Sequence, residues 1–252
     1  MTASLRALLT NLIDYAGLYP PAGLPLAAVT ENYERYRALT EGWMLNRLVL
    51  PSPKLSEVQL RAGWRITLLV DQEPGTLAPQ IETLETKGVR ALSLPTYCEA
   101  PLSQIESGYV KVRTGGLTPD AIPAPAELAD FLLRAAALRR PFKATAGLHH
   151  PIRSHRALTY ATDSPRGVMH GFVNVFVAAA FAWHAIDRGV VLDVLNETDP
   201  ASFEFSDTQL RWRGHSLSTT QIREARRDFA HSFGSCSFEE PVADLRELGW
   251  LL

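Results

Sequence analysis

Short hydrophobic runs alternate along the chain with segments whose apolar residues recur every three or four positions. The short runs predict strands at residues 12–18, 45–50, 65–70, 89–94, 109–113, 142–146 and 233–238. The helical periodicity predicts helices at residues 26–39, 55–62, 77–87, 126–139, 168–185, 219–231 and 242–248. Two further strand-like runs, at 203–205 and 210–213, flank a turn at Ser206 and Asp207.

This alternation of strands and helices predicts βα units and a parallel sheet. The number of strand-like runs is about eight, and the length of 252 residues is typical of a (β/α)8 barrel. We therefore expect a single TIM barrel domain over residues 1–252, with an open doubly wound sheet as the alternative. In either fold, ligands bind at the carboxyl ends of the strands.

Two lysines lie inside strand-like runs that end in glycine. Lys111 belongs to the run YVKVRTGG and Lys143 to the run PFKATAGLHHP, with a predicted helix between them. Lysine is costly to bury and is rare in the middle of a strand. The pair therefore predicts a polar site where the two strands end.

Side chains on a strand alternate between its two faces, so Lys111 and Arg113 share a face, as do Lys143, Thr145 and His149. The opposite positions are apolar and suit packing against helices. We expect both lysines to point into the barrel. A neighbouring cation and a partly dry site lower the pKa of a lysine, and a neutral amine can attack a carbonyl to form a Schiff base.

The two lysines can also be explained by a structural role. Either lysine can serve only as the partner of a carboxylate, and the candidates are Asp14, Asp71 and Glu239. Among the carboxylates, Asp14 is the best candidate for general acid–base catalysis, because Tyr15 and Tyr19 flank it where a strand meets a turn.

The runs VKVRTGG and FKATAG resemble the two lysine strands of the deoxyribose-phosphate aldolase family, which are class I aldolases with VKTSTGF-like and VKAAGG-like strands. The run HSFGSCSF at residues 231–238 is similar to that family's glycine-serine phosphate-binding run. The resemblance implies that Lys111 forms the Schiff base, that Lys143 tunes it, and that Gly234 and Ser235 contact phosphate.

The resemblance covers about a fifth of the chain, and the chain departs from the family in three places. Lys111 falls in the fifth predicted strand, whereas the family's Schiff-base lysine lies on the sixth. The segment before GSCS is longer than in the family, and the run AGLHHPIR after Lys143 has no counterpart there.

Histidines and their neighbours form a second group of candidates. His149 is a candidate acid–base residue, and the substrate-contact candidates beside it are His150, Arg153, His170 and Asn174. Histidines at the end of a strand also serve as metal ligands or as structural residues, and both readings stay open. Adjacent residues on an extended chain point in opposite directions, and the following proline keeps His150 extended, so a shared ion would need a turn.

Two glycine-containing turns are candidate anion sites. Arg113, Gly115 and Gly116 offer a guanidinium and free backbone amides, and Gly234, Ser235 and Ser237 precede a predicted helix N-terminus. Ordinary structural turns have the same composition. Together the turns indicate a small anionic substrate, with phosphate as one candidate for the anionic group.

Charge and cysteine content exclude several classes of function. The chain carries 25 basic and 27 acidic residues, a net charge of −2, so it lacks the basic excess of nucleic-acid binders. Its two cysteines, with no CxxC pair, are too few for a disulfide framework and indicate buried thiols. The apolar stretch at residues 171–182 is too short to span a bilayer. We expect a cytoplasmic protein without a cofactor and without a nucleic-acid or membrane partner, and a homo-oligomer is one possible state.

Three functions are compatible with these patterns. The first is an aldolase-like carbon–carbon lyase that acts on a small anionic carbonyl compound through a lysine imine. The second is a metal-assisted hydrolase or isomerase that uses His149, His150 or His170. The third is a non-catalytic barrel that binds an anionic metabolite or a partner protein.

Overall fold

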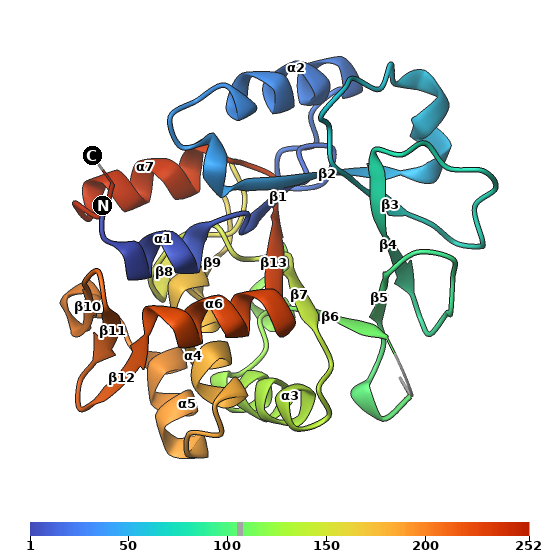
Figure 1. Ribbon diagram of the computed structural model, residues 1–252. Helices are drawn as coiled ribbons and strands as arrows, with labels where there is room; N and C mark the ends of the chain where they lie inside the picture. The colour runs from blue at the N-terminus through green and yellow to red at the C-terminus, as the bar shows by residue number, and fades with distance from the viewer. Residues whose placement is uncertain (105–107, 252) are drawn as a thin grey trace.

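The computed structural model describes residues 1–104 and 108–251 and shows a closed barrel of parallel strands (Figure 1). In chain order, the barrel strands are β1 (Ile13–Tyr15), β2 (Leu45–Pro51), β3 (Ile66–Leu69), β4 (Ile81–Lys87), β5 (Thr96–Glu99), β6 (Tyr109–Arg113), β7 (Phe142–Thr145) and β13 (Ala230–Ser235). Each strand pairs with the next, and β13 closes the ring between β7 and β1. The predicted (β/α)8 barrel is confirmed, and the open sheet was the wrong alternative.

Helices cover the outside of the barrel over most of its circumference. The α-helices are α1 (Ala3–Leu9), α2 (Leu26–Arg37), α3 (Pro125–Ala137), α4 (Phe172–Trp183), α5 (Arg188–Asn196), α6 (Thr219–Asp228) and α7 (Glu239–Glu247). Short 3-10 helices are η1 (Gly42–Met44), η2 (Ser52–Glu57), η3 (Leu102–Gln104), η4 (Pro119–Ala121) and η5 (Pro200–Ser202). Helix α4 is buried from Phe172 to Ala182 and packs between α3, α5, α6 and β13, as an apolar helix must.

The connection between β7 and β13 carries most of the additional structure. It contains the hairpin of β8 (Ser154–Ala157) and β9 (Arg166–Met169), and an antiparallel sheet of β10 (Phe203–Phe205), β11 (Gln209–Trp212) and β12 (His215–Ser218). The strands predicted at 203–205 and 210–213 therefore exist, but they lie outside the barrel. The helix predicted over 168–185 begins only at Phe172, because Val168 belongs to the hairpin, and α5 follows it as a separate helix.

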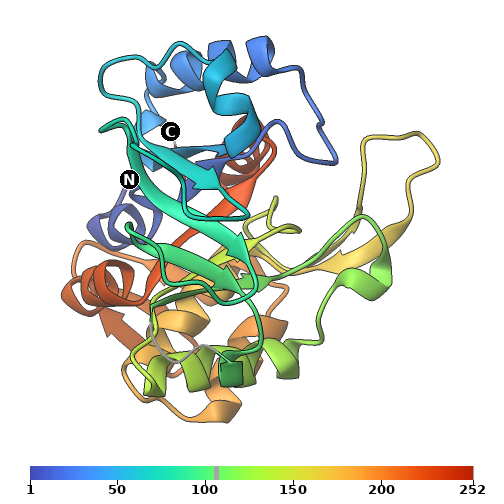
Figure 2. The same cartoon turned by 90° about the vertical axis from the view of Figure 1, so that its right-hand side faces the viewer.

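The side of the barrel formed by β3, β4 and β5 is covered by loops (Figure 2). The connections over residues 70–80 and 88–95, all of them described, contain no helix. Their leucines Leu77, Leu92 and Leu94 instead pack against the core from irregular backbone. The helix predicted at 77–87 and the strand predicted at 89–94 were wrong because this spacing of leucines imitates regular structure.

Smaller differences concern the ends of elements. The helix predicted at 55–62 is the 3-10 helix η2, which ends at Glu57. The helix predicted at 219–231 ends at Asp228, and the last barrel strand begins at Ala230 rather than at residue 233. Strands β4 and β5 were not predicted and the strand predicted at 89–94 does not exist, so the lysine strands β6 and β7 are the sixth and seventh strands of the barrel.

The barrel interior is polar where barrels are usually filled by branched apolar residues. Thr67 and Thr83 form a hydrogen bond of 2.8 Å between β3 and β4, and Asp14, Glu85 and Lys143 are buried nearby. A polar interior of this kind is stable only if its charges are paired.

None of the helices in the described part of the chain combines the length and the apolar character needed to cross a membrane.

The turns after β6 and β7 pack backbone against backbone. A Cβ atom on Gly115 would lie 2.8 Å from the Cα of Gly147, and Gly147 has a positive φ of 78°. Thr114 ties the same turns together by donating from its backbone amide to the Thr145 carbonyl, at 2.9 Å. The two glycines therefore set the spacing of the strand ends that carry the lysines.

We expect Gly115→Ala to destabilise the fold by about 1–3 kcal/mol, because the new methyl group would clash with the Gly147 backbone. The measurement is the urea midpoint of unfolding. Gly75→Ala is the matched control, because a Cβ there meets no atom within 4 Å. Equal midpoints for the two variants would contradict the close contact.

Candidate active site

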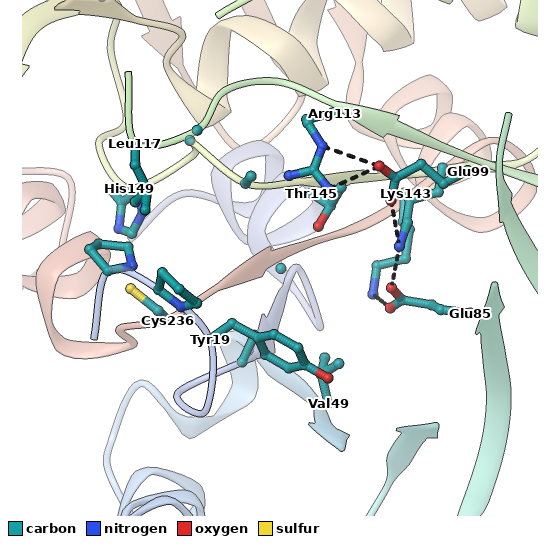
Figure 3. A pocket seen from close by; sticks show the side chains of 18 of the residues that line it. Tyr19, Val49, Glu85, Glu99, Arg113, Leu117, Lys143, Thr145, His149 and Cys236 are labelled. Atoms are coloured by element: carbon teal, nitrogen blue, oxygen red, sulfur yellow. Dashed lines mark hydrogen bonds and ion pairs between the residues drawn. The ribbon is translucent and has the colours of Figure 1, made fainter. Parts of the chain in front are cut away.

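A cavity of about 420 Å³ opens at the carboxyl ends of the barrel strands (Figure 3). Side chains from β2 to β7 line it, together with Tyr19 and its neighbours after β1 and with Leu158 and Met169 of the hairpin segment. This end of the barrel is where sequence analysis predicted the site, and the volume suits a small metabolite.

Both lysines point into this cavity. Lys111 and Lys143 are register partners on the paired strands β6 and β7, and both ammonium groups contact the carboxylate of Glu85 on β4. Lys111 Nζ lies 3.0 Å from Glu85 Oε2, and Lys143 Nζ contacts Glu85 Oε1. The predicted inward orientation of the two lysines is confirmed.

Lys143 is almost completely buried, at 1% exposure, and lies between two carboxylates. Its Nζ donates to Asp14 Oδ2 at 2.5 Å as well as to Glu85. Burial alone would lower the pKa of Lys143, but the charges of Asp14 and Glu85 outweigh burial and raise it above its ordinary value. Lys143 is therefore an ammonium group at neutral pH.

Asp14 anchors this ammonium from β1. It accepts hydrogen bonds from Ser232 Oγ at 2.8 Å and from Asn46 Nδ2 at 2.7 Å. Burial favours the neutral acid, but the charges of Lys143 and Arg47 outweigh burial and hold the pKa of Asp14 below its ordinary range. Asp14 does not line the cavity, so its contacts are those of a residue that positions Lys143.

Lys111 continues a series of ion pairs in which positive and negative side chains alternate. Its Nζ lies 2.8 Å from Glu99 Oε2, and Arg113 donates to the other oxygen of Glu99 at 2.9 Å. The pKa of Glu85 is also lowered, because Lys143 and Lys111 outweigh the effect of its burial. This ion-pair series consists of Asp14, Lys143, Glu85, Lys111, Glu99 and Arg113.

Neither glutamate of this ion-pair series, Glu85 or Glu99, was predicted from the sequence. Glu85 lay in a segment assigned to a helix, and Glu99 is the last residue of β5, a strand that was not predicted. The signal was present in the run IETLETK, where Thr83, Glu85 and Lys87 alternate with other residues at a period of two. Of the other carboxylates proposed as lysine partners, Asp71 is exposed and Glu239 pairs with Arg35.

The hydroxyl of Tyr19 is buried in the cavity wall and has no hydrogen-bond partner among the described residues. Burial, together with the negative charge of Glu85, raises the pKa of Tyr19 far above its ordinary value, so the hydroxyl stays neutral. A buried hydroxyl without a partner is costly, and a bound substrate would satisfy it.

His149 and Cys236 lie across the cavity from Glu85 and Glu99 (Figure 3). His149 Nδ1 contacts Glu240 Oε2 of α7 at 2.9 Å, an arrangement that orients the ring for acid–base chemistry at its other nitrogen. His150 Nδ1 contacts Asp244 of the same helix at 2.5 Å. The two rings thus face one helix, and the expectation that they point in opposite directions was wrong because the chain bends there.

Three substrate-contact candidates serve the scaffold instead. Asn174 is fully buried and donates from Nδ2 to the carbonyls of Val194 and Glu197, at 2.7 and 2.8 Å. It also accepts from the backbone amide of Arg153 at 2.9 Å. His170 is fully buried beside the carbonyl of Pro123, 2.9 Å from Nε2. None of the candidates Arg153, His170 and Asn174 is among the residues that line the cavity.

The two glycine turns contribute less to the cavity than expected. Gly116 and Gly234 line it, whereas Gly115 is used in the contact with Gly147. Ser235 Oγ accepts from the Ser237 amide at 3.3 Å, and Ser237 Oγ accepts from the Glu240 amide at 3.1 Å. The hydroxyls of both serines thus stabilise the turn before α7.

Within residues 1–104 and 108–251, no three histidine, cysteine or acidic side chains come together in a way that could hold a metal ion. Burial raises the pKa of the Cys236 thiol above its ordinary value, which makes the thiol a poor nucleophile.

No protein-family model, curated protein or solved structure matches this chain. The site is therefore interpreted from its own geometry.

We expect Asp14→Asn to destabilise the protein by about 3–5 kcal/mol at pH 7, because Lys143 would lose one of its two buried carboxylates. Urea unfolding measures the loss. Asp130→Asn, which breaks the exposed pair of Asp130 with Arg188, should leave the midpoint nearly unchanged.

The difference between wild type and Asp14→Asn should depend on pH. Because the folded-state pKa of Asp14 is depressed, its contribution is complete above its unfolded value of about 3.8 and is lost as pH falls further through the folded pKa. A difference that stays constant down to pH 2 would contradict this ion pair.

Proposed function

We propose that the protein is an aldolase-like carbon–carbon lyase that forms an imine between Lys111 and a small anionic carbonyl substrate. The observation that carries the proposal is the pairing of Lys111 with Lys143 on adjacent strands, with both ammonium groups on one glutamate in a cavity at the carboxyl end of the barrel. Enzymes of this reaction class need an amine nucleophile and acid–base groups in a partly dry site.

Lys111 is the better nucleophile of the two. Lys143 is held as an ammonium group by Asp14 and Glu85, and its raised pKa opposes loss of the proton. Lys111 is more exposed than Lys143, at 7% against 1%, and it lies between Glu85 and Glu99, so either carboxylate can accept its proton. Lys143 then supplies a fixed positive charge beside the reacting amine, which favours electron flow towards the imine.

The reaction proceeds in three stages, which are imine formation, bond cleavage and product release. The Lys111 amine adds to the substrate carbonyl, and loss of one water gives the protonated imine. A base removes the proton of the substrate hydroxyl, the carbon–carbon bond breaks, and its electron pair moves into the imine to form an enamine, while the carbon that carried the hydroxyl leaves as the first carbonyl product. Protonation of the enamine carbon and addition of water release the second product and the free amine.

Three side chains are placed to move protons or to bind the substrate. The neutral hydroxyl of Tyr19 and the ring of His149 both face the cavity and serve as proton donor and acceptor. Arg113 is half-exposed, and Lys87 also lines the cavity, without an ion-pair partner in the described part of the chain. These two cations favour an anionic substrate.

The resemblance to deoxyribose-phosphate aldolases supports the same assignment. With β4 and β5 in place of the single strand predicted at 89–94, Lys111 lies on the sixth barrel strand, where that family carries its Schiff-base lysine, and the apparent difference in strand number disappears. The long segment before GSCS is the inserted hairpin, helices and small sheet.

Borohydride trapping tests the proposal. We expect reduction in the presence of acetaldehyde, pyruvate or glyceraldehyde 3-phosphate to attach one of these carbonyl compounds to the peptide that contains Lys111. Lys111→Arg keeps the positive charge between Glu85 and Glu99 but cannot form the imine, and it should give no adduct. Lys54→Met, which alters an exposed lysine, is the control that should trap normally.

The absence of any adduct on Lys111 with a substrate that the enzyme turns over would exclude the imine. Binding of a carbonyl compound without turnover would instead favour a non-catalytic barrel.

We expect Tyr19→Phe to lower kcat roughly 100-fold, because it removes a hydroxyl that moves a proton. Borohydride trapping on Lys111 should persist in this variant, since the amine is untouched. Steady-state kinetics and trapping yield measure the two effects, and an unchanged kcat would show that Tyr19 only fills the wall.

A further inference from the structure

A second cavity, of about 620 Å³, lies at the amino-terminal end of the barrel. It is lined by residues from the amino-terminal halves of the strands and by one face of α6, and the proposed lyase reaction makes no use of it. Tyr97 and Tyr109 form part of its wall, with His231 beside them. The lining is dominated by the guanidinium groups of Arg47, Arg65, Arg223, Arg226 and Arg227.

The positive charge of this lower cavity is poorly compensated. Its lining contains a single acidic residue, Glu82, which is shared by Arg47 at 2.8 Å and Arg65 at 3.0 Å. Arg227 pairs with Asp228, outside the lining. Five arginines therefore line this lower cavity, although the protein as a whole has a net charge of −2.

Several guanidinium donors remain without partners. Arg47 and Arg65 bond to Glu82 through Nε, so their terminal NH₂ groups have no hydrogen-bond partner in the described part of the chain. The side chain of Arg223 forms no hydrogen bond or ion pair with any described residue and is exposed on α6. These donors are available to a ligand.

Arg226 has a different role. Its guanidinium donates to backbone carbonyls of α1, of the turn after it and of β13, including Leu8 at 2.9 Å and His231 at 2.6 Å. Burial lowers the pKa of this guanidinium, because no carboxylate pairs with it among the described residues. Its charge therefore adds to the positive potential of the cavity while its donors hold the scaffold together.

We propose that this lower cavity binds a small metabolite that carries phosphate groups. The planar guanidinium fork matches phosphate oxygens in a bidentate geometry, and Arg47, Arg65 and Arg223 together offer several such donors. The volume is within the range of metabolite sites. A polyanion in this position would neutralise charge that the protein itself leaves unpaired.

The lower cavity shares a wall with the candidate active site. Tyr97 lines the lower cavity and accepts or donates a hydrogen bond of 2.7 Å with His231, while its ring lies 5.7 Å from Lys143 Nζ on the other side. Asn46 and the backbone of Arg47 also bridge the two, because both contact Asp14. The ligand would therefore bind one layer of side chains below the buried lysine.

Calorimetric titration of the full chain with inorganic pyrophosphate at low salt tests this site. We expect saturable binding at one site, weakened about tenfold or more in Arg223→Gln and Arg65→Gln, because each loses a charge-assisted hydrogen bond. Arg188→Gln is the control, because it removes the same charge from α5, outside the cavity. This variant should bind pyrophosphate as the wild type does.

Three results would overturn the proposal. These are no saturable binding, equal weakening by Arg188→Gln and Arg223→Gln, or weakening by Arg113→Gln in the upper cavity but not by Arg223→Gln. Citrate provides the second anion, and we expect it to bind more weakly than pyrophosphate. Equal or tighter binding of citrate would contradict the assignment to phosphate. The titration measures no turnover, so its outcome is independent of imine formation.

Discussion

The structure depends on one buried ammonium group held between two carboxylates from different strands. Lys143 connects β7 to Asp14 on β1, two strands away in the ring, and to Glu85 on β4, three strands away, so it joins non-adjacent strands across the interior. Removing charges from water is expensive, and only complete pairing makes such an arrangement tolerable. The interior of this barrel therefore contains paired charges where other barrels have packed apolar side chains. These charges, on Asp14, Lys143 and Glu85, form a fixed layer beneath the cavity.

That layer divides the barrel into two different ends. Above it, Lys111 and Glu99 face a cavity that Tyr19, Lys87, Arg113 and His149 also line. Below it, Tyr97 closes the floor, and arginines surround a second hollow. Both ends contain basic side chains, but only the upper end places lysine amines beside carboxylates.

Much of the upper site could be predicted from the sequence because its signals are local. The alternation of Lys111 with Arg113 and of Lys143 with Thr145 determines which face each side chain occupies, and the parallel register then brings the lysines together. The carboxylates Glu85 and Glu99 could not be found in this way. Strand β5 has only four residues, and in β4 the residues Ile81 and Leu84 continue the helical spacing that begins at Leu77 in the loop before the strand.

The side of the barrel covered by loops has a consequence for the diversification of this fold. Strands β4 and β5 carry the glutamates, and the connections beside them hold no helix that an insertion would displace. Loops tolerate added residues far better than packed helices do. Related chains can therefore acquire longer segments over residues 70–80 and 88–95, which would alter access to the mouth while the charged floor stays in place.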